Sequence, residues 1–430
     1  MELLVDLHIH SHFSRATSPE MNLSCLYRYG KIKGINIIGT GDFTHPAYFK
    51  EIKEKLEPAE NGLFKLKDEF ARGEDRFVPQ SCKGNLIRFV PTVEISSIYS
   101  KAGRVRKVHN LIVAPDLKAV TEINARLAKI GNLTADGRPI LGLDSKELLK
   151  ITLASDPRAF FIPAHIWTPW FSIFGSKSGF NSLQEAFEEL TPEIKALETG
   201  LSSDPFMNWR WSNLDGITLI SNSDAHSPGK LAREANVLDI TPGYDELINA
   251  IKTGDERFKG TIEFFPDEGK YHLDGHRLCK IRFTPEETRK HKGICPVCGK
   301  ALVIGVENRV EELADRDDQY KPKNHKQVEY IIPLSEIISE IVNVKSTSSA
   351  KVKNEFERIC TSLGDEFSVL RKIPIDEMKA KGFPELAEGI RRMRGGFVHI
   401  EPGYDGVYGI IKVFAGKSDR LYLQGQTNLL

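Results

Sequence analysis

The sequence predicts an α/β protein built around a barrel, and two observations lead to this prediction. Short apolar runs alternate with helix-like segments over about the first 260 residues. Repeated strands and helices over this length predict a parallel α/β architecture. Each apolar run is also followed, near its C-terminal end, by a His, Asp or Glu. This pattern favours a barrel, because the loops at the C-terminal ends of barrel strands meet at one mouth.

The individual elements follow from hydrophobic periodicity. Buried strands are expected at residues 3–7, 35–38, 86–90, 108–113, 160–162 and 216–220, and helices at 117–130, 182–190 and 244–253. Near residue 261 the composition changes to Cys, His and basic residues, and after residue 311 the chain becomes helical and polar. In this last region we expect helices at 333–342 and 351–363, a loop at 344–350, and a turn at 402–406 between strand-like runs.

Charge and composition exclude some classes of protein. The 430 residues contain 59 Lys and Arg and 59 Asp and Glu, which excludes a globally basic nucleic-acid coat protein and an acidic disordered tail. Local basic patches stay compatible with nucleic-acid binding. The acidic start of the chain does not resemble a signal peptide, and no run approaches the roughly 18 apolar residues of a membrane span. We expect a cytoplasmic protein whose six Cys are metal ligands or free thiols.

A metal site is predicted from residues that follow the expected strands. His8 and His10 stand two positions apart, so on a strand both imidazoles point to the same side. Five further candidate ligands follow along the chain, namely Glu94, His109, His165, Asp224 and His226. For any single His, hydrogen bonding is the better explanation. The whole series at successive strand ends instead predicts a metal centre.

This order of residues resembles the polymerase-and-histidinol-phosphatase (PHP) superfamily of metal-dependent phosphoesterases over roughly residues 1–230. The resemblance implies a distorted (β/α)7 barrel with two or three divalent metals at its mouth. It implies metal ligands at His8, His10, Glu94, His109, His165, Asp224 and His226, with Glu94 as the bridging carboxylate. Catalysis would then involve His8, His10, Glu94, Asp224 and His226.

Two departures from the PHP pattern affect the number of metals. Asp42-Phe43 stands where the superfamily usually has Asp-His, and Ser14-Arg15-Ala16 stands where it often has another ligand. We expect Asp42 to compensate as a ligand or as a supporting carboxylate, with His12 and His45 as alternatives. Arg15 is either a contact to a phosphate or a surface residue. The mixed ligand set suits Zn²⁺, Mn²⁺ or Fe²⁺, with Mg²⁺ also open.

A second metal site is predicted between residues 276 and 298. His276 and Cys279 form one pair with a two-residue spacer, and Cys295 and Cys298 form another. This spacing is typical of a structural Zn²⁺ site. The fourth ligand is less certain than the three Cys, since His272 or His291 could replace His276.

Aromatic and basic residues near the expected ligands indicate where DNA could bind. Candidate contacts are Trp167, Trp170, Trp209 and Arg210, which could stack on a base, and Lys177, Ser178 and Gly179, which could hold phosphates. The basic run at 101–107 is a further candidate. The alternatives are packing over the barrel for the Trp residues and solvated loops for the basic segments.

Over nearly its full length the chain resembles the archaeal endonuclease Q family. The resemblance rests on the PHP ligands, the 167–179 loop, the 276–298 module, the run at 305–316 and the turn at 402–409. It implies a DNA-repair endonuclease that flips a deaminated base (uracil, hypoxanthine or xanthine) or an abasic site. The enzyme would cut the phosphodiester bond on the 5′ side by a metal-activated hydroxide, leaving 3′-hydroxyl and 5′-phosphate ends.

The expected domains are a PHP barrel at 1–260, a zinc module at 261–312 and a mainly helical C-terminal region at 313–430. DNA is the expected partner, with nucleoid association in an archaeal cell. The tail at 424–430 resembles the start of a sliding-clamp-binding peptide. Two other functions stay open: a small-molecule phosphoesterase of histidinol-phosphatase type, and a non-catalytic DNA-binding or scaffold protein.

Overall fold

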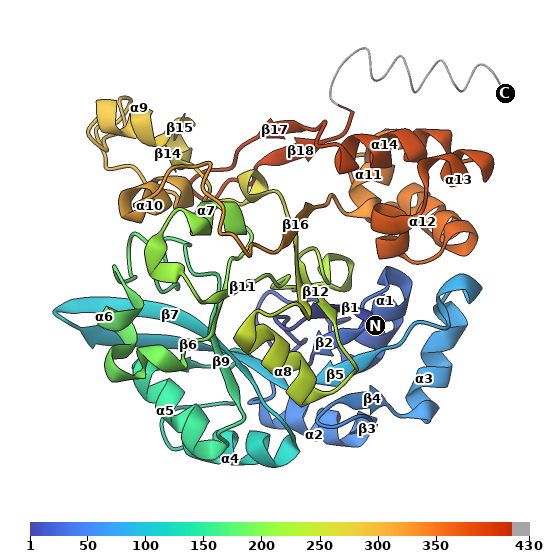
Figure 1. Cartoon of the computed structure of the whole chain (residues 1–430), viewed down its shortest axis with the longest axis horizontal. Coiled ribbons are helices and arrows are strands. Elements are labelled where there is room, and N and C mark those ends of the chain that lie inside the picture. Colours follow the sequence, from blue (N-terminus) through green and yellow to red (C-terminus); the bar gives the residue numbers. More distant parts are fainter. Residues whose placement is uncertain (415–430) are drawn as a thin grey trace.

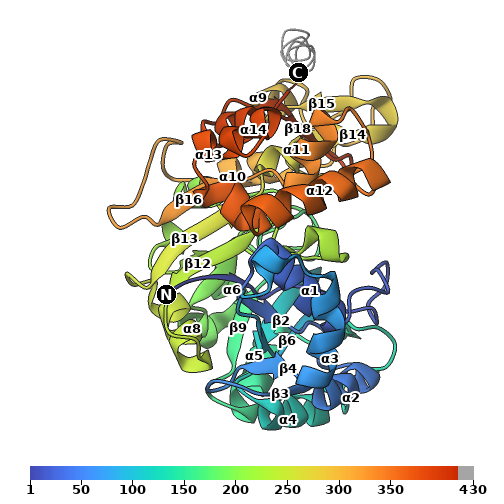
Figure 2. The ribbon, with the colours of Figure 1, turned by 90° about the vertical axis from the view of Figure 1, so that its right-hand side faces the viewer.

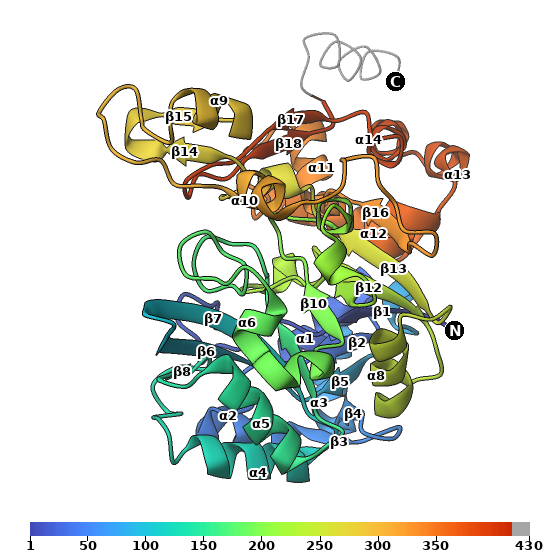
Figure 3. The ribbon, with the colours of Figure 1, turned by 60° about the vertical axis from the view of Figure 1, so that its left-hand side comes forward.

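The structure is a computed structural model that describes residues 1–414. It has two layers: a lower α/β region, and an upper layer formed by the chain after about residue 264 (Figure 1). Figures 2 and 3 show the upper layer lying across one end of the lower region. The tail at 424–430, where a clamp-binding peptide is predicted, lies outside the described residues. Within residues 1–414, no helix is both long and apolar enough to cross a membrane.

The lower region contains strands at all six predicted apolar runs and seven further strands that were not predicted. In chain order, the strands are β1 (Glu2–Asp6), β2 (Ile37–Gly39), β3 (Leu56–Pro58), β4 (Phe64–Leu66), β5 (Arg88–Val90), β6 (Thr92–Lys101), β7 (Arg104–Val113), β8 (Ile140–Leu141), β9 (Phe160–Pro163), β10 (Ala196–Glu198), β11 (Thr218–Ile220), β12 (Ala235–Asp239) and β13 (Phe258–Glu263).

Hydrogen bonds distribute these strands over three sheets. The largest also includes β16 (Gln327–Tyr330) and has the order β16-β13-β12-β1-β2-β5-β4-β3, a second has the order β8-β6-β7-β9, and the third pairs β10 with β11. Single contacts join the sheets: Ile166 N donates to the Glu198 carbonyl at 3.1 Å, and Ile9 forms a bridge with Ala225. No continuous ladder closes a ring within residues 1–414. The fold is therefore mixed α/β, and the barrel stays a prediction.

The prediction of a parallel arrangement is only partly correct. β1, β2 and β5 are parallel, whereas β6, β7 and β9 pair antiparallel. The reason lies in the two residues that join β6 to β7, since Ala102 and Gly103 both have positive φ, at 51° and 72°. Two such residues form the tight turn of a β-hairpin, which reverses the chain without a crossover helix.

Helices cover the outside of the lower region. They are α1 (Leu23–Lys33), α2 (Pro46–Lys55), α3 (Asp68–Glu74), α4 (Leu117–Leu127), α5 (Ser145–Ser155), α6 (Leu183–Phe187), α7 (Pro205–Trp209) and α8 (Tyr244–Thr253). The helix predicted at 244–253 is confirmed with these bounds. The one predicted at 182–190 stops at Phe187 because Glu188 has a φ of 51°, outside the helical region.

The lower strands share one apolar core. It contains Leu3 and Val5 of β1, Leu7 just after it, and residues of eight other strands, namely Ile37, Val90, Leu111, Val113, Phe160, Ile162, Ala196, Ile220, Leu238 and Phe258. Helix α8 adds Leu247, Ile248 and Ile251 to the same cluster. These strands and helix α8 therefore share one apolar interior.

The upper layer contains the predicted metal module and the C-terminal helices. Its elements are β14 (Asp274–His276), β15 (Ile281–Phe283), α9 (Pro285–Lys290), α10 (Val306–Leu313), β16 (Gln327–Tyr330), α11 (Leu334–Ile341), α12 (Ala350–Leu363), α13 (Ile375–Ala380), α14 (Pro384–Arg394), β17 (His399–Glu401) and β18 (Ile410–Lys412). The helices predicted at 333–342 and 351–363 are confirmed as α11 and α12.

Many contacts join the upper layer to the lower one, and two of them show how they are joined. Strand β16 pairs in parallel with β13, so the upper layer extends the largest sheet. The buried Lys33 ammonium on α1 lies 2.7 Å from the Glu366 carboxylate, which is buried as well. Strand β13 also crosses residue 260, where the predicted boundary between the first two domains lies.

Candidate metal centre and pocket

The predicted ligands of the first metal site lie together around one carboxylate. Glu94 Oε1 is 2.7 Å from His109 Nδ1, 3.0 Å from His165 Nε2 and 3.5 Å from His8 Nε2. Its other oxygen, Oε2, is 3.4 Å from His10 Nε2. Imidazoles around a carboxylate form a donor set that suits divalent metals such as Zn²⁺, Mn²⁺ or Fe²⁺.

Asp224 and His226 complete the cluster on the side of His10. Asp224 Oδ1 is 3.1 Å from His10 Nε2 and 3.7 Å from His226 Nδ1. Three overlapping groups have ligand atoms within 4.8 Å of one another: His8, His10 and Glu94; His10, Asp224 and His226; and Glu94, His109 and His165. All seven residues that the PHP resemblance implies as ligands are thus in these groups.

Two carboxylates orient the first two histidines from behind. His8 Nδ1 lies 3.0 Å from both carboxylate oxygens of Glu198, and His10 Nδ1 lies 3.2 Å from Asp42 Oδ1. A carboxylate on one ring nitrogen fixes the tautomer and leaves the other nitrogen free to bind a metal.

Ligand atoms that lack a hydrogen-bond partner indicate whether metals fit this site. His8 Nε2, His10 Nε2 and Asp224 Oδ1 are buried and have no hydrogen-bond partner within the described part of the chain. Buried polar atoms without a partner are costly. Divalent metals would satisfy all three, so the residues fit such ions.

Asp42 therefore lies behind His10 and not among the grouped ligand atoms. Its Oδ2 accepts hydrogen bonds from Ser11 N and Ser11 Oγ, both at 2.7 Å, and from Ser14 Oγ at 2.8 Å. Of the two alternatives, His12 Nδ1 lies 3.2 Å from the Met21 carbonyl, and the His45 ring stacks on Phe13. Neither belongs to the grouped residues.

Burial and charge set the protonation states in the site. Burial alone would lower the pKa of His8, but the Glu198 and Glu94 carboxylates outweigh it and raise this pKa well above its usual value. Burial lowers the pKa of His109 to about 4, so this imidazole is neutral at neutral pH and able to ligate a metal. Burial would raise the pKa of Glu94, but the surrounding histidines and the Arg138 guanidinium hold it well below its usual value.

The backbone is strained where it presents the ligands. His165 and Asp224 have φ values of 30° and 46°, and Asp42 has 47°. Such values are uncommon outside glycine and concentrate at functional sites. Beside His165 the chain also needs a glycine, because a Cβ on Gly200 would lie 2.5 Å from the His165 Cβ.

A cavity of about 340 Å³ opens above the metal-site residues. His109, His165 and Asp224 line it together with five aromatic side chains, namely Trp170, Phe171, Phe264, Tyr271 and Tyr408. Arg138 and Lys270 contribute positive charge. Since Tyr271 and Tyr408 belong to the upper layer, this layer completes the pocket.

The predicted DNA contacts have different surroundings. Trp170 is half-buried and lines the pocket, with its ring 5.9 Å from that of Tyr271. Trp167 is 1% exposed, donates to Asn208 Oδ1 and packs on Phe174 and Trp211. Its ring is therefore not accessible for stacking on a base in this conformation, and Trp167 packs inside the protein.

The remaining candidates do not line this pocket. Trp209 is on α7 and lines a separate cavity of about 480 Å³, and Arg210 follows it. Lys177 is exposed, whereas Ser178 is buried and its hydroxyl donates to the Lys107 carbonyl. Gly179 accepts a hydrogen bond from Arg106, so this part of the 101–107 run contacts the protein itself.

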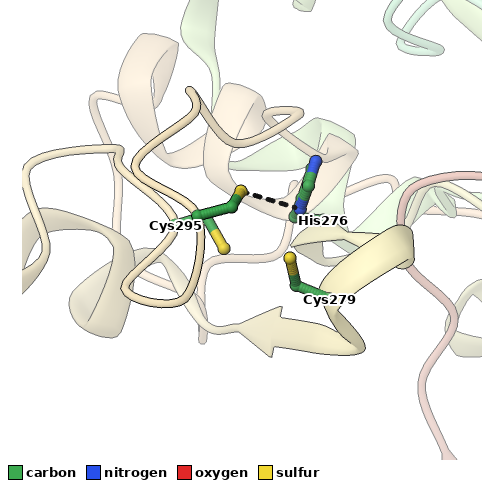
Figure 4. A group of neighbouring side chains, drawn as sticks. His276, Cys279 and Cys295 are labelled. Carbon is green, nitrogen blue, oxygen red and sulfur yellow. Dashed lines mark hydrogen bonds between the residues drawn. The ribbon is translucent and has the colours of Figure 1, made fainter.

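The second predicted metal site is also assembled. His276, Cys279, Cys295 and Cys298 have ligand atoms within 4.8 Å of one another, and Figure 4 shows three of these side chains pointing toward each other. His276 Nδ1 lies 3.6 Å from Cys298 Sγ. Of the two alternative ligands, His272 contacts the Ser202 carbonyl and His291 stacks on Phe283.

Sequence reasoning missed two residues of the first site. Glu198 follows an apolar run of only two residues, so no strand was expected there, although an acidic residue at a strand end is the pattern that identified the other ligands. Arg138 lies in an irregular loop and gave no signal in the sequence. Its Nη1 donates to Glu94 Oε2 at 3.0 Å.

Known proteins resemble the chain in part and as a whole. A family model described as MJ0043 C-terminal domain matches residues 333–396. The uncharacterized protein MJ0043 of Methanocaldococcus jannaschii is 34% identical over 256 residues, covering 57% of this chain, which spans 31% of that protein. The uncharacterized protein YqxK of Bacillus subtilis is 28% identical over 390 residues, covering 88% of this chain and 89% of YqxK.

Two solved structures match over almost the whole chain. One is the lesion-specific endonuclease PfuEndoQ of Pyrococcus furiosus, with 30% identity, a TM-score of 0.82, and 98% of this chain and 99% of that chain covered. The other is an endonuclease Q complex with a 27-mer duplex substrate that has an abasic lesion at the active site. It has 30% identity and a TM-score of 0.83, and covers 97% and 98% of the two chains. The chain belongs to the endonuclease Q family.

Proposed function

We propose that this protein is a DNA-repair endonuclease that cuts the phosphodiester bond 5′ to a deaminated base (uracil, hypoxanthine or xanthine) or an abasic site. The observation that carries the proposal is the full-length likeness to an endonuclease Q bound to DNA with an abasic lesion at its active site. The cluster of metal-site residues beneath an aromatic pocket supports it.

The proposed metal ligands are His8, His10, Glu94, His109, His165, Asp224 and His226, for two or three Zn²⁺, Mn²⁺ or Mg²⁺ ions. Bound there, such ions lower the pKa of water and neutralise charge on a phosphoryl group. The protein's own contribution is orientation: Glu198 and Asp42 hold the rings of His8 and His10 so that both Nε2 atoms face the ions.

The pocket above the metals suits a nucleotide that has left the base stack. We propose that Trp170 stacks on this nucleotide, an interaction of about 1–3 kcal/mol per base. A damaged pair costs less to open than an intact one, which favours lesions over normal bases. Lys177, Gly179, Trp209 and Arg210 are proposed contacts to the flanking DNA.

The other parts of the chain have proposed roles as well. The strands of residues 1–260 form a distorted (β/α)7 barrel, which their common apolar core supports. The module at 261–312 holds one structural Zn²⁺ through His276, Cys279, Cys295 and Cys298. The region at 313–430 contributes to DNA binding, and its tail at 424–430 binds a sliding clamp.

Nicking of a labelled duplex tests the proposed function. A duplex with one deoxyuridine, deoxyinosine or abasic site and an undamaged duplex are incubated with the protein and Mg²⁺ or Mn²⁺, and the products are mapped on a sequencing gel. We expect one nick 5′ to the lesion, absent from the undamaged duplex and from His8→Ala. Turnover of a generic phosphomonoester without cleavage of either duplex would instead identify a small-molecule phosphoesterase.

A further inference from the structure

Arg138 lies where the pocket meets the metal-site residues. It belongs to the loop between α4 and β8, and its side chain is 29% exposed. It lines the same cavity as His109, His165 and Asp224. The side chain therefore faces the space that a substrate would fill.

The loop that carries Arg138 is held in place by residues that lie around His10. Gly137 N donates to the Phe13 carbonyl at 3.0 Å. A Cβ on Gly137 would lie 2.3 Å from Asp42 Oδ2 and 2.5 Å from Ser14 Oγ, so a larger residue does not fit. The position of the next residue, Arg138, is thus tied to the Asp42 carboxylate that holds His10.

Within residues 1–414, the Arg138 guanidinium uses only one of its N–H groups in a hydrogen bond to the protein. Nη1 donates to Glu94 Oε2, and over residues 1–414 its other N–H groups have no protein acceptor. Arginine has five such donors in a planar fork that matches the oxygens of a phosphate. Arg15, which the sequence offered as a phosphate contact, is instead 80% exposed and pairs with Asp136.

We propose that Arg138 is a catalytic residue that donates a hydrogen bond to a non-bridging oxygen of the phosphate being cleaved. The proposal rests on the proposed endonuclease function. One donor would stay on Glu94 while the free donors face the pocket. A fixed cation at this place stabilises the negative charge that grows on the phosphoryl oxygens in the transition state.

Replacement of Arg138 gives the first test. We expect Arg138→Ala to lower kcat/KM for a lesion duplex by about 10²- to 10³-fold, as for the loss of one transition-state donor. Arg138→Lys keeps the charge without the fork and should lose roughly tenfold. Arg126→Ala is the matched control, because Arg126 pairs with Glu122 on the surface of α4. The number of metals per chain, measured by mass spectrometry, should stay unchanged in all three variants.

Neutral phosphates give the second test. Duplexes with a single methylphosphonate, at the phosphate to be cut or at one neighbouring position, are assayed with wild type and with both Arg138 variants. If Arg138 contacts the cleaved phosphate, neutralising that phosphate should slow wild type much more than Arg138→Ala, since contacting groups are coupled in such a cycle. At the neighbouring position the two proteins should slow equally.

Each outcome decides one question. A wild-type protein that leaves lesion duplexes uncut would refute the proposed function itself. Normal wild-type cleavage with equally fast cleavage by Arg138→Ala would overturn the role of Arg138 alone. Loss of metal from both Arg138 variants, or equal methylphosphonate effects in wild type and variants, would assign Arg138 to holding Glu94 and not to the substrate.

Discussion

Replacing Glu198 with Gln tests whether the buried carboxylate behind His8 sets metal affinity. Glu198 accepts hydrogen bonds from three donors: His8 Nδ1 at 3.0 Å, His165 N at 2.8 Å and Asn222 Nδ2 at 2.9 Å. Gln has almost the same size but carries an NH₂ group, which cannot accept. One of the three donors would then face another donor, and the ring of His8 would lose its charged partner.

The expected loss follows from these contacts. A hydrogen bond to a charged group contributes about 1.5–3 kcal/mol and a neutral one about 1 kcal/mol, so the His8 contact weakens by about 0.5–2 kcal/mol. At about 1.4 kcal/mol per factor of ten, metal affinity falls roughly 2- to 30-fold. This range overlaps the roughly 10- to 100-fold effects known for residues that support metal ligands. The donor left without an acceptor should also lower Tm.

Metal affinity is measured by competition with a chromophoric chelator, and nicking is measured at saturating metal. Glu122→Gln is the control, because Glu122 pairs with Arg126 on the surface. We expect the nicking rate of Glu198→Gln to recover partly when metal is added in excess. An affinity within twofold of wild type would refute the idea that Glu198 acts through His8.

Three further predictions concern other parts of the chain. Cys295→Ser should remove one zinc per chain and lower Tm, whereas Cys25→Ser should keep the zinc; equal zinc content in both would contradict the predicted ligand set. Burial and the nearby Asp204 raise the pKa of Glu263 to about 8 from 4.5, so this carboxyl is neutral when folded and resists ionisation. Stability should therefore fall as pH rises from about 5 to 8, and Glu263→Gln should flatten the dependence of Tm on pH; parallel curves would argue against it. Trp167→Ala should lower the free energy of unfolding by about 3–5 kcal/mol, as for a buried aromatic side chain. Trp170→Ala should keep Tm and weaken the binding of lesion DNA, measured by fluorescence anisotropy. The opposite pattern would mean that Trp167 contacts the DNA and Trp170 stabilises the fold.

The structure groups all seven residues that the PHP resemblance implies as metal ligands, and the sequence could offer them because they follow short apolar runs. A run such as 160–162 identifies a strand by composition, and the polar residue after it then marks the mouth of the fold. Sequence reasoning missed Glu198 because the apolar run before it has only two residues, Ala196 and Leu197. The turn at Ala102 and Gly103 was also missed, although a Gly in a short polar connection is a hairpin signal. Local pattern therefore predicts an element when the element is long enough to show its period.

Sequence reasoning missed Arg138 for another reason, because the contacts of Arg138 involve residues far away in the chain. Its loop is fixed by contacts to Phe13 and Asp42, more than 90 residues earlier, and its partner is Glu94. No local sequence pattern predicts these contacts, because they form only after the loops have come together in the folded protein. The same holds for the pocket, since Tyr271 and Tyr408 reach it from the upper layer.

The division between the two layers bears on which substrate the site accepts. The lower region supplies every grouped residue of the first metal site, and these alone would serve any phosphoester. The upper layer closes the pocket with Tyr271, Tyr408 and Lys270, and it brings the second metal group and a further set of helices. A small phosphoester would need none of this additional surface. A duplex needs it, because one nucleotide must enter the pocket while the DNA on either side is held outside. If the proposed function is correct, the metal-site residues of the lower region would serve the cleavage step, and selection for damaged DNA should be sought in the residues after 264.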